Sequence, residues 1–220
     1  MKRASVKGSG MTSDRTRERM VEGLKKEGVS NRRVLAALKK IPRHIFVDEA
    51  LASRAYVNTA LPIGLGQTIS QPYIVARMTE EVFNGRRLKK VLEVGTGSGY
   101  QAAILSEVVE QVYSVERIET LMKLARSRFM ALGIRNIRLK HSDGHWGWPD
   151  YGPYDAIVVT AAPEEIPQEL LGQLAVGGRL VIPVGGGRNQ QLHIVTRTAQ
   201  EYQLEIKENV TFVPLKAGNQ

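Results

Sequence analysis

The chain has 220 residues, of which 42% are apolar and 24% are charged, and it contains no cysteine. Such a length and composition are typical of one globular domain, while the lack of cysteine excludes disulfides, thiolate metal sites and a cysteine nucleophile. No apolar run approaches the ~18–20 residues of a membrane span, and the basic N-terminus lacks the apolar segment of a secretory signal. The sequence therefore predicts a cytoplasmic location without a membrane partner.

The net charge of +9 raises the question of a nucleic-acid partner. Residues 1–20 hold six basic and two acidic side chains, and the remaining excess of positive charge is spread thinly over 200 residues. This distribution favours a solvated basic surface over a continuous track for phosphates. We therefore expect no nucleic-acid partner.

The N-terminal part of the chain is predicted to be helical. Apolar periodicity indicates a helix over residues 13–27 and a second helix that Ser30 caps and that stops before Pro42. A compact glycine-bearing loop is expected over 61–71, and Pro72 is placed in the first turn of a third helix.

From residue 90 onward, strands and helices alternate. The predicted strands are 90–94, 112–116, 137–141, 156–160 and 179–183, and the predicted helices are 100–109, 118–132 and 168–174. Two further alternating runs, 191–197 and 202–213, are expected to close the sheet as an antiparallel edge. This order predicts an α/β fold with a doubly wound, mostly parallel sheet.

The domain organisation follows from these segments. Residues 1–12 are expected to form a flexible leader, and 13–220 a single domain. Within it, 13–88 would supply the N-terminal helices and a substrate loop, and 89–220 a cofactor-binding core.

The most informative segment is 91–99, which reads Val-Leu-Glu-Val-Gly-Thr-Gly-Ser-Gly. Tyr100 stands where the dinucleotide fingerprint needs its third glycine, so a pyrophosphate site is not predicted. The remaining pattern resembles motif I of the Rossmann-like S-adenosylmethionine-dependent methyltransferases. Read without that resemblance, the glycines could also form only a tight turn. Glu116 ends the next strand, where its two carboxylate oxygens suit the two hydroxyls of a ribose.

In such folds the ligand lies beyond the carboxyl ends of the strands. From the loops at these ends we expect ten cofactor-binding residues, namely Glu93, Gly95, Thr96, Gly97, Ser98, Glu116, Arg117, Asp143, Gly144 and Thr160. Glu93 would gather the charged amino-acid end of the cofactor, and Asp143 would accept from the adenine amine. The alternatives are a surface carboxylate at Glu116 and an ordinary turn at 143–144.

Two other residue groups near this site have competing interpretations. His141 and His145 flank Asp143, but neither a fourth ligand nor an H-E-x-x-H helix accompanies them, so no metal is expected. Trp146 and Trp148 could stack on bases, although covering the cofactor pocket or the core is the simpler expectation.

The absence of certain motifs narrows the methyl acceptor. Residues 160–163 read Thr-Ala-Ala-Pro where amino-methylating enzymes carry a sequence like Asn-Pro-Pro-Tyr, and there is no cysteine for covalent pyrimidine methylation. A substrate that brings its own nucleophile would fit.

Several motifs in chain order together resemble the bacterial protein-L-isoaspartate (D-aspartate) O-methyltransferases. They are Arg-His-Ile-Phe-Val-Asp at 43–48, Leu-Pro-Ile-Gly at 61–64, Gly-Gln-Thr-Ile-Ser-Gln-Pro at 66–72, Val-Thr-Ala-Ala-Pro at 159–163, Pro-Val-Gly at 183–185 and Phe-Val-Pro-Leu at 212–215. The resemblance runs from about residue 17 to residue 220. It implies that S-adenosylmethionine methylates the carboxylate of L-isoaspartyl, and by extension D-aspartyl, residues in damaged proteins, leaving S-adenosylhomocysteine. The ester then collapses to a succinimide, and the protein is expected to act as a monomer.

By the same resemblance, Ser70 is the active-site serine, with a positioning role and not a nucleophilic one, since no His–Asp pair is evident to activate it. Its alternative role is to cap the helix that Pro72 begins. The implied substrate cleft comprises Thr68, Ile69, Ser70, Val184, Gly185, Val213 and Pro214. Extended backbone there could pair with the damaged peptide. Two rivals are a methyltransferase for RNA or a small molecule, and a non-enzymatic nucleic-acid-binding module.

Overall fold

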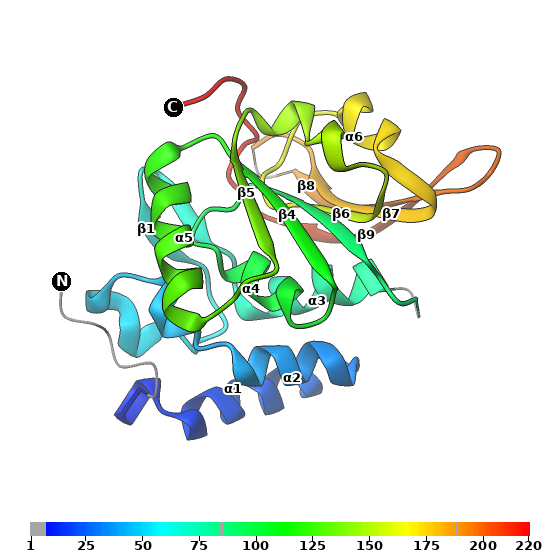
Figure 1. Cartoon of the computed structure of the whole chain (residues 1–220). Coiled ribbons are helices and arrows are strands. Elements are labelled where there is room, and N and C mark those ends of the chain that lie inside the picture. Colours follow the sequence, from blue (N-terminus) through cyan, green and yellow to red (C-terminus); the bar gives the residue numbers. More distant parts are fainter. Residues whose placement is uncertain (1–7, 84–85, 188) are drawn as a thin grey trace.

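A seven-stranded sheet forms the centre of the computed structural model, which describes residues 8–83, 86–187 and 189–220 (Figure 1). Its strand order is β5-β4-β3-β6-β7-β8-β9. The strands are β3 (Lys90–Val94), β4 (Gln111–Glu116), β5 (Ile137–His141), β6 (Tyr154–Val159), β7 (Leu174–Val184), β8 (Gln190–Arg197) and β9 (Tyr202–Val210). The first five run parallel, while β8 and β9 are antiparallel to their neighbours. The predicted mostly parallel sheet with an antiparallel edge is confirmed.

Helices cover both faces of the sheet. They are α1 (Asp14–Lys26), α2 (Arg32–Lys40), α3 (Pro72–Phe83), α4 (Tyr100–Ser106), α5 (Glu119–Leu132) and α6 (Gln168–Gly172). Apolar side chains of α1 to α5 share one core with one face of the sheet, and α6 covers a second core on the other face. Figure 1 shows α1 and α2 outside α3 and α4. Among the described residues, no helix has the length and apolar character needed to cross a membrane.

The start of α2 differs from the sequence prediction. Asn31, not Ser30, caps the helix, because the Asn31 Oδ1 atom accepts the N–H groups of Arg33 and Val34. The Ser30 N–H instead donates to Glu80 on α3, at 2.8 Å. Glu80 also accepts the N–H of Asn31, so this tertiary contact fixes both residues before the helix, and the Asn31 side chain is the one that caps it.

Other predicted boundaries also move. The expected loop over 61–71 contains a small hairpin, β1 (Leu61–Gly64) and β2 (Gln67–Ile69). The predicted helix over 168–174 ends at Gly172, because Leu174 already belongs to the long strand β7. Of the predicted flexible leader, residues 1–7 lie outside the described residues, while Gly10–Thr12 form a short 3-10 helix.

A buried arginine connects the segment before β1 to the first turn of α4. Arg43 is fully buried, and its Nε donates to the Ala55 carbonyl at 2.8 Å and its Nη2 to the Thr59 carbonyl at 3.4 Å. Its guanidinium carbon lies 4.9 Å from the ring centre of Tyr100, the first residue of α4. The cation is thus held by carbonyl dipoles and a ring face, without a carboxylate partner among the described residues.

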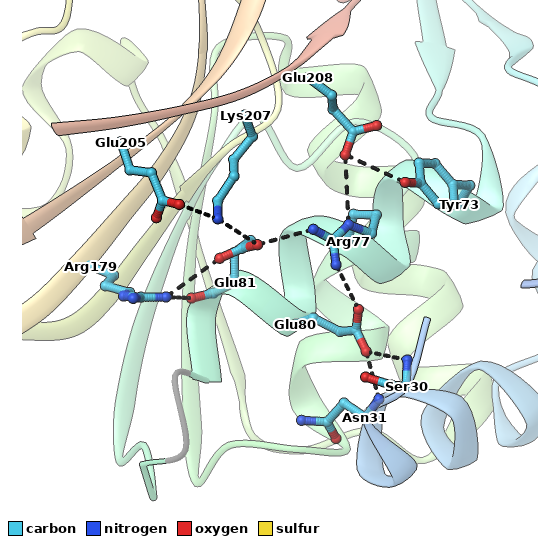
Figure 2. A network of polar contacts seen from close by, with 10 residues as sticks. All are labelled: Ser30, Asn31, Tyr73, Arg77, Glu80, Glu81, Arg179, Glu205, Lys207 and Glu208. Carbon is cyan, nitrogen blue, oxygen red and sulfur yellow. Dashed lines mark hydrogen bonds and ion pairs between the residues drawn. The ribbon is translucent and has the colours of Figure 1, made fainter. Parts of the chain in front are cut away.

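Charged side chains hold α3 against the strand β9 (Figure 2). Arg77 lies at their centre: its Nη1 is 3.1 Å from Glu80, its Nη2 is 3.1 Å from Glu81, and its Nε is 3.6 Å from Glu208 on β9. Tyr73, in the first turn of α3, also donates its hydroxyl to Glu208, at 3.5 Å. Because Ser70 and the hairpin directly precede α3, this network fixes their approach to the sheet.

The same helix is tied to α2 and β7. Glu80 accepts the backbone N–H groups of Ser30 and Asn31, and Arg179 of β7 donates to the Glu81 carbonyl at 3.1 Å. These contacts together form what we call the α3 clamp, defined as Tyr73, Arg77, Glu80, Glu81, Arg179, Lys207 and Glu208 (Figure 2).

We expect Arg77→Met to lower the free energy of unfolding by about 1–3 kcal/mol, because charged hydrogen bonds to partly buried carboxylates are lost. Arg87→Met is the matched control, since Arg87 pairs with Glu110 while 82% of its side chain is exposed; such pairs contribute little. Urea unfolding of both variants measures the difference. Equal losses in the two variants would contradict a special role for the clamp.

Candidate active site

A pocket opens at the carboxyl ends of the parallel strands, where the sequence predicts the ligand. The predicted residues that line it are Thr68, Ile69, Ser70, Gly95, Thr96, Gly97, Ser98, Glu116, Arg117, Gly144, Thr160, Val213 and Pro214. The structure therefore brings most of the predicted cofactor residues and the predicted serine loop to one cavity.

Glu116 organises the middle of this pocket. Its Oε2 accepts the backbone N–H of Gly97 at 2.7 Å, and its Oε1 accepts the N–H of Ile118 at 2.9 Å. Each carboxylate oxygen has a second acceptor position. The side chain, which is nearly buried but lines the pocket, can therefore accept two further hydrogen bonds from a ligand.

Gly95 is required by a close approach within the protein. Its φ is +94°, and a Cβ atom there would lie 2.5 Å from the hydroxyl oxygen of Thr160. That hydroxyl donates to the Gly95 carbonyl at 2.6 Å. The glycine thus lets the ends of β3 and β6 meet at the pocket floor, in addition to removing a side chain from the ligand's path.

Glu93 is the predicted cofactor residue whose placement is least expected. It is fully buried, and it is not among the described residues that line the pocket. The Ser114 hydroxyl donates to its Oε2, and Ser114 in turn lies 2.6 Å from the hydroxyl of Thr96, which does line the pocket. Its Oε1 is buried without a hydrogen-bond partner among the described residues. Burial raises the pKa of Glu93 to about 8, against the opposing effect of the Ser114 hydrogen bond.

Asp143 is not among the described lining residues either, and it is occupied by the protein itself. Its Oδ1 accepts the backbone N–H of His145 at 2.9 Å and lies 2.8 Å from the His145 ring Nδ1, while its Oδ2 accepts the N–H of Gly218 at 2.6 Å. Although burial opposes the shift, hydrogen bonds from Gly218 and His145 hold the pKa of this carboxyl below its ordinary value. Only one acceptor position, on Oδ2, remains for an adenine amine.

Ser70 lines the pocket, and its hydroxyl makes no hydrogen bond to any residue that the structure describes. The helix α3 starts at Pro72, and the Gln71 carbonyl accepts the Val75 N–H, so Gln71 occupies the cap position. The alternative role of Ser70 as a helix cap is therefore not what the structure shows. Its hydroxyl is available to a ligand.

Val184 and Gly185 are not brought to the pocket in the described structure. Val184 is the last residue of β7, paired with β8, and the Gly185 N–H donates to the Pro163 carbonyl at 2.9 Å. Sequence reasoning also missed several lining residues, namely Gln67, Val75, Val94, Tyr100, Gln101, Val115, Ile118, Ala161, Leu215 and Lys216. Most of them directly adjoin the motifs that were recognised, and this adjacency is the signal that could have found them.

The histidines and tryptophans near the pocket have structural partners. His141 contacts the Arg117 carbonyl at 3.0 Å, and His145 is held by Asp143. In the described ranges, no group of three or more His, Asp or Glu side chains lies close enough to hold a metal ion. Trp148 packs in the second core, whereas 61% of Trp146 is exposed.

We expect Glu93→Gln to change how stability depends on pH. Between its ordinary value of 4.5 and about 8, the unfolded chain loses the Glu93 proton while the folded protein keeps it. Stability therefore falls as pH rises through this window, by at most about 1.4 kcal/mol per pH unit. The glutamine cannot ionise, so its advantage over the native protein should grow from pH 5 to pH 8. Urea unfolding at each pH measures this, and a constant difference would refute it.

Comparison with known sequences identifies the family of the chain. A family model described as protein-L-isoaspartate(D-aspartate) O-methyltransferase matches residues 15–220. A protein-L-isoaspartate O-methyltransferase of Hahella chejuensis is 61% identical over 208 residues, which cover 94% of this chain and 99% of that protein. One from Halorhodospira halophila is 54% identical, covering 99% of both chains.

Solved structures agree with this result. A protein-L-isoaspartate O-methyltransferase with 32% identity superposes with a TM-score of 0.84 over 92% of this chain and 66% of the other, so this chain spans about two thirds of that protein. A Plasmodium falciparum protein described as the same enzyme, solved in complex with S-adenosyl-L-homocysteine, has 25% identity and a TM-score of 0.79 over 91% of this chain and 98% of its own. This chain belongs to the protein-L-isoaspartate(D-aspartate) O-methyltransferase family.

Proposed function

We propose that this protein transfers a methyl group from S-adenosylmethionine to the carboxylate of L-isoaspartyl residues in damaged proteins, and to that of D-aspartyl residues. Membership of the family supports this reaction, and it does not favour RNA or a small molecule as the methyl acceptor. The observation that supports it best is one shared pocket in which the glycine turn and Glu116 face the Ser70 loop. Transfer would begin repair, because the methyl ester can collapse to a succinimide.

The pocket residues fit S-adenosylmethionine, which supplies an electrophilic methyl group on a sulfonium when it is bound. Glu116 has acceptor positions left for two ribose hydroxyls, and Asp143, which adjoins the lining residue Gly144 without lining the pocket itself, has one position that would take the adenine amine. Thr96 lines the pocket, and its hydroxyl lies 2.6 Å from that of Ser114, which in turn donates to Glu93. Through this chain of hydroxyls, rather than by direct contact, Glu93 would act on the amino-acid end of the cofactor.

The acceptor half of the pocket needs alignment more than acid–base chemistry. An isoaspartyl carboxylate is ionised at pH 7, and no oxyanion develops when it attacks a methyl group. The Ser70 hydroxyl, which has no partner among the described residues, can donate to one carboxylate oxygen and orient the other. Holding two reactants in this way is worth roughly 7–11 kcal/mol of a reaction barrier.

The broader setting is also part of the proposal. We expect a monomer that acts in the cytoplasm on proteins, and the thinly dispersed positive charge supports the expectation that nucleic acid is not a partner. Residues 13–220 would act as one domain, since a single core runs from Met20 in α1 to Val210 in β9. Two extended stretches, 67–69 and 213–216, line the pocket and could bind the substrate backbone.

The direct test measures methanol released after incubation of the protein and S-adenosylmethionine with an isoaspartyl peptide. The same peptide with a normal aspartyl residue is the control, and we expect methanol release only from the isoaspartyl peptide. Peptides that differ in one flanking residue should be methylated at rates within a few-fold of each other, because a cleft that binds the peptide backbone does not distinguish the flanking side chains. Equal methanol release from the isoaspartyl and aspartyl peptides would exclude the proposed function.

Ser70→Ala should reduce turnover by roughly one to three powers of ten while leaving affinity for S-adenosylhomocysteine nearly unchanged, because alignment of the acceptor alone is lost. Ser127→Ala is the matched control, since this exposed serine lies on α5 and does not line the pocket. Steady-state rates and calorimetric binding measure the two effects. An unchanged rate for Ser70→Ala would remove Ser70 from the mechanism.

A further inference from the structure

The chain passes over the pocket once more after its last strand. Beyond β9, residues 213–216 form part of the pocket wall, and the Leu215 N–H donates to the Ala162 carbonyl at 2.8 Å. The following residues, 217–220, bind the segments that follow β4 and β5, so the C-terminus lies at the same edge of the sheet as the pocket (Figure 1). We call residues 217–220 the strap.

The strap is anchored at one side by the loop after β5. The Gly218 N–H donates to Asp143 Oδ2 at 2.6 Å. Asp143 is fixed from the other direction by the backbone and ring of His145. Asp143, which is predicted to accept a hydrogen bond from the adenine amine, thus also binds the strap. The strap therefore lies beside the predicted adenine position.

At the other side the strap is bound by the turn after β4. Arg117 donates from Nε to the Gly218 carbonyl at 3.0 Å and from Nη1 to the Gln220 side chain at 3.1 Å. The backbones also pair, since the Gln220 N–H donates to the Arg117 carbonyl at 2.7 Å and the Glu119 N–H to the Gln220 carbonyl at 2.8 Å. Arg117 lines the pocket next to Glu116, the expected ribose ligand.

We propose that the strap is a positioning segment of the cofactor site: it bridges the adenine loop and the ribose turn and thereby holds the wall 213–216 over the adenosyl end. This inference rests on the cofactor site of the proposed function. In this proposal Arg117 and Gly218 act by holding the strap in place, not by direct contact with the cofactor. Because the strap is exposed and held mainly by hydrogen bonds, it can open without unfolding of the core, as exchange of cofactor and product requires.

The strap should therefore govern how fast the product leaves. In a chain shortened to residues 1–216, the dissociation rate and dissociation constant of S-adenosylhomocysteine are expected to rise about tenfold. The KM for S-adenosylmethionine should rise similarly, whereas kcat should fall by less than about twofold, since the Ser70 side of the pocket is intact. A general loss of structure would instead lower kcat and the melting temperature together.

Smaller changes keep the test informative if the shortened chain does not fold. Gln220→Ala removes only the Nη1 contact, and Gly218→Ala places a side chain at a φ of +76° with open space around it, so only the backbone is strained. Each should raise the dissociation rate several-fold. Gln203→Ala is the matched control, since this exposed glutamine on β9 contacts only Glu201 through its side chain among the described residues, and it should leave the rate unchanged.

A double-mutant cycle separates the strap from direct contact. Arg117→Lys should weaken S-adenosylhomocysteine binding in the full chain but add nothing in the shortened chain. Amide exchange gives an independent readout: the Gly218 and Gln220 amides should be protected in the free protein and more so with S-adenosylhomocysteine. Unchanged affinity and dissociation rate in the shortened, folded chain, or additive effects of Arg117→Lys, would overturn the proposal. Neither outcome depends on which substrate is methylated.

Discussion

The Glu116 carboxylate is the contact on which the geometry of the site depends. By accepting the N–H groups of Gly97 and Ile118, it joins the turn after β3 to the turn after β4. Neighbouring parallel strands do not by themselves fix how the loops at their ends approach each other. A carboxylate that bridges two backbone donors does so, and it keeps its outer acceptor positions directed at the pocket. The same side chain therefore shapes the cavity and offers its main polar contact to a ligand.

The N-terminal helices complete the pocket from the opposite side. They place the hairpin and Ser70 through α3, which is held by charged contacts to α2, β7 and β9 (Figure 2). Arg43 supplies a second connection, between the segment before β1 and α4. The serine loop and the glycine turn come from separate segments of the chain, so their distance is set by these joints and not by local sequence. Alignment of two reactants is only as precise as this framework.

How far the sequence predicts the structure depends on how local each signal is. The glycine turn, Glu116 and the alternating strands were found because their spacing is short and their chemistry specific. Sequence alone does not distinguish Asn31 from Ser30 as the cap of α2, because both side chains can accept hydrogen bonds and the contact that fixes this segment comes from Glu80, 50 residues away from Ser30. The partner of Asp143 was missed for the same reason, since Gly218 is 75 residues further along the chain. Glu93 is buried because both faces of the central strand β3 are covered, and its partner Ser114 comes from the neighbouring strand β4, a pairing that the spacing of residues 91–99 does not reveal.

The full burial of Arg43 affects how its link to α4, compared with the α3 clamp, responds to salt. Its cation is held by carbonyl dipoles and the Tyr100 ring in a region that mobile ions do not enter, and although burial lowers its pKa to about 10, it stays protonated at neutral pH. Dissolved salt screens charges at a surface much more than charges in an interior. The partly buried carboxylates of the α3 clamp are screened less than the exposed Arg87–Glu110 pair, and Arg43 is screened least, so both connections should keep the serine loop and the glycine turn in place as ionic strength rises.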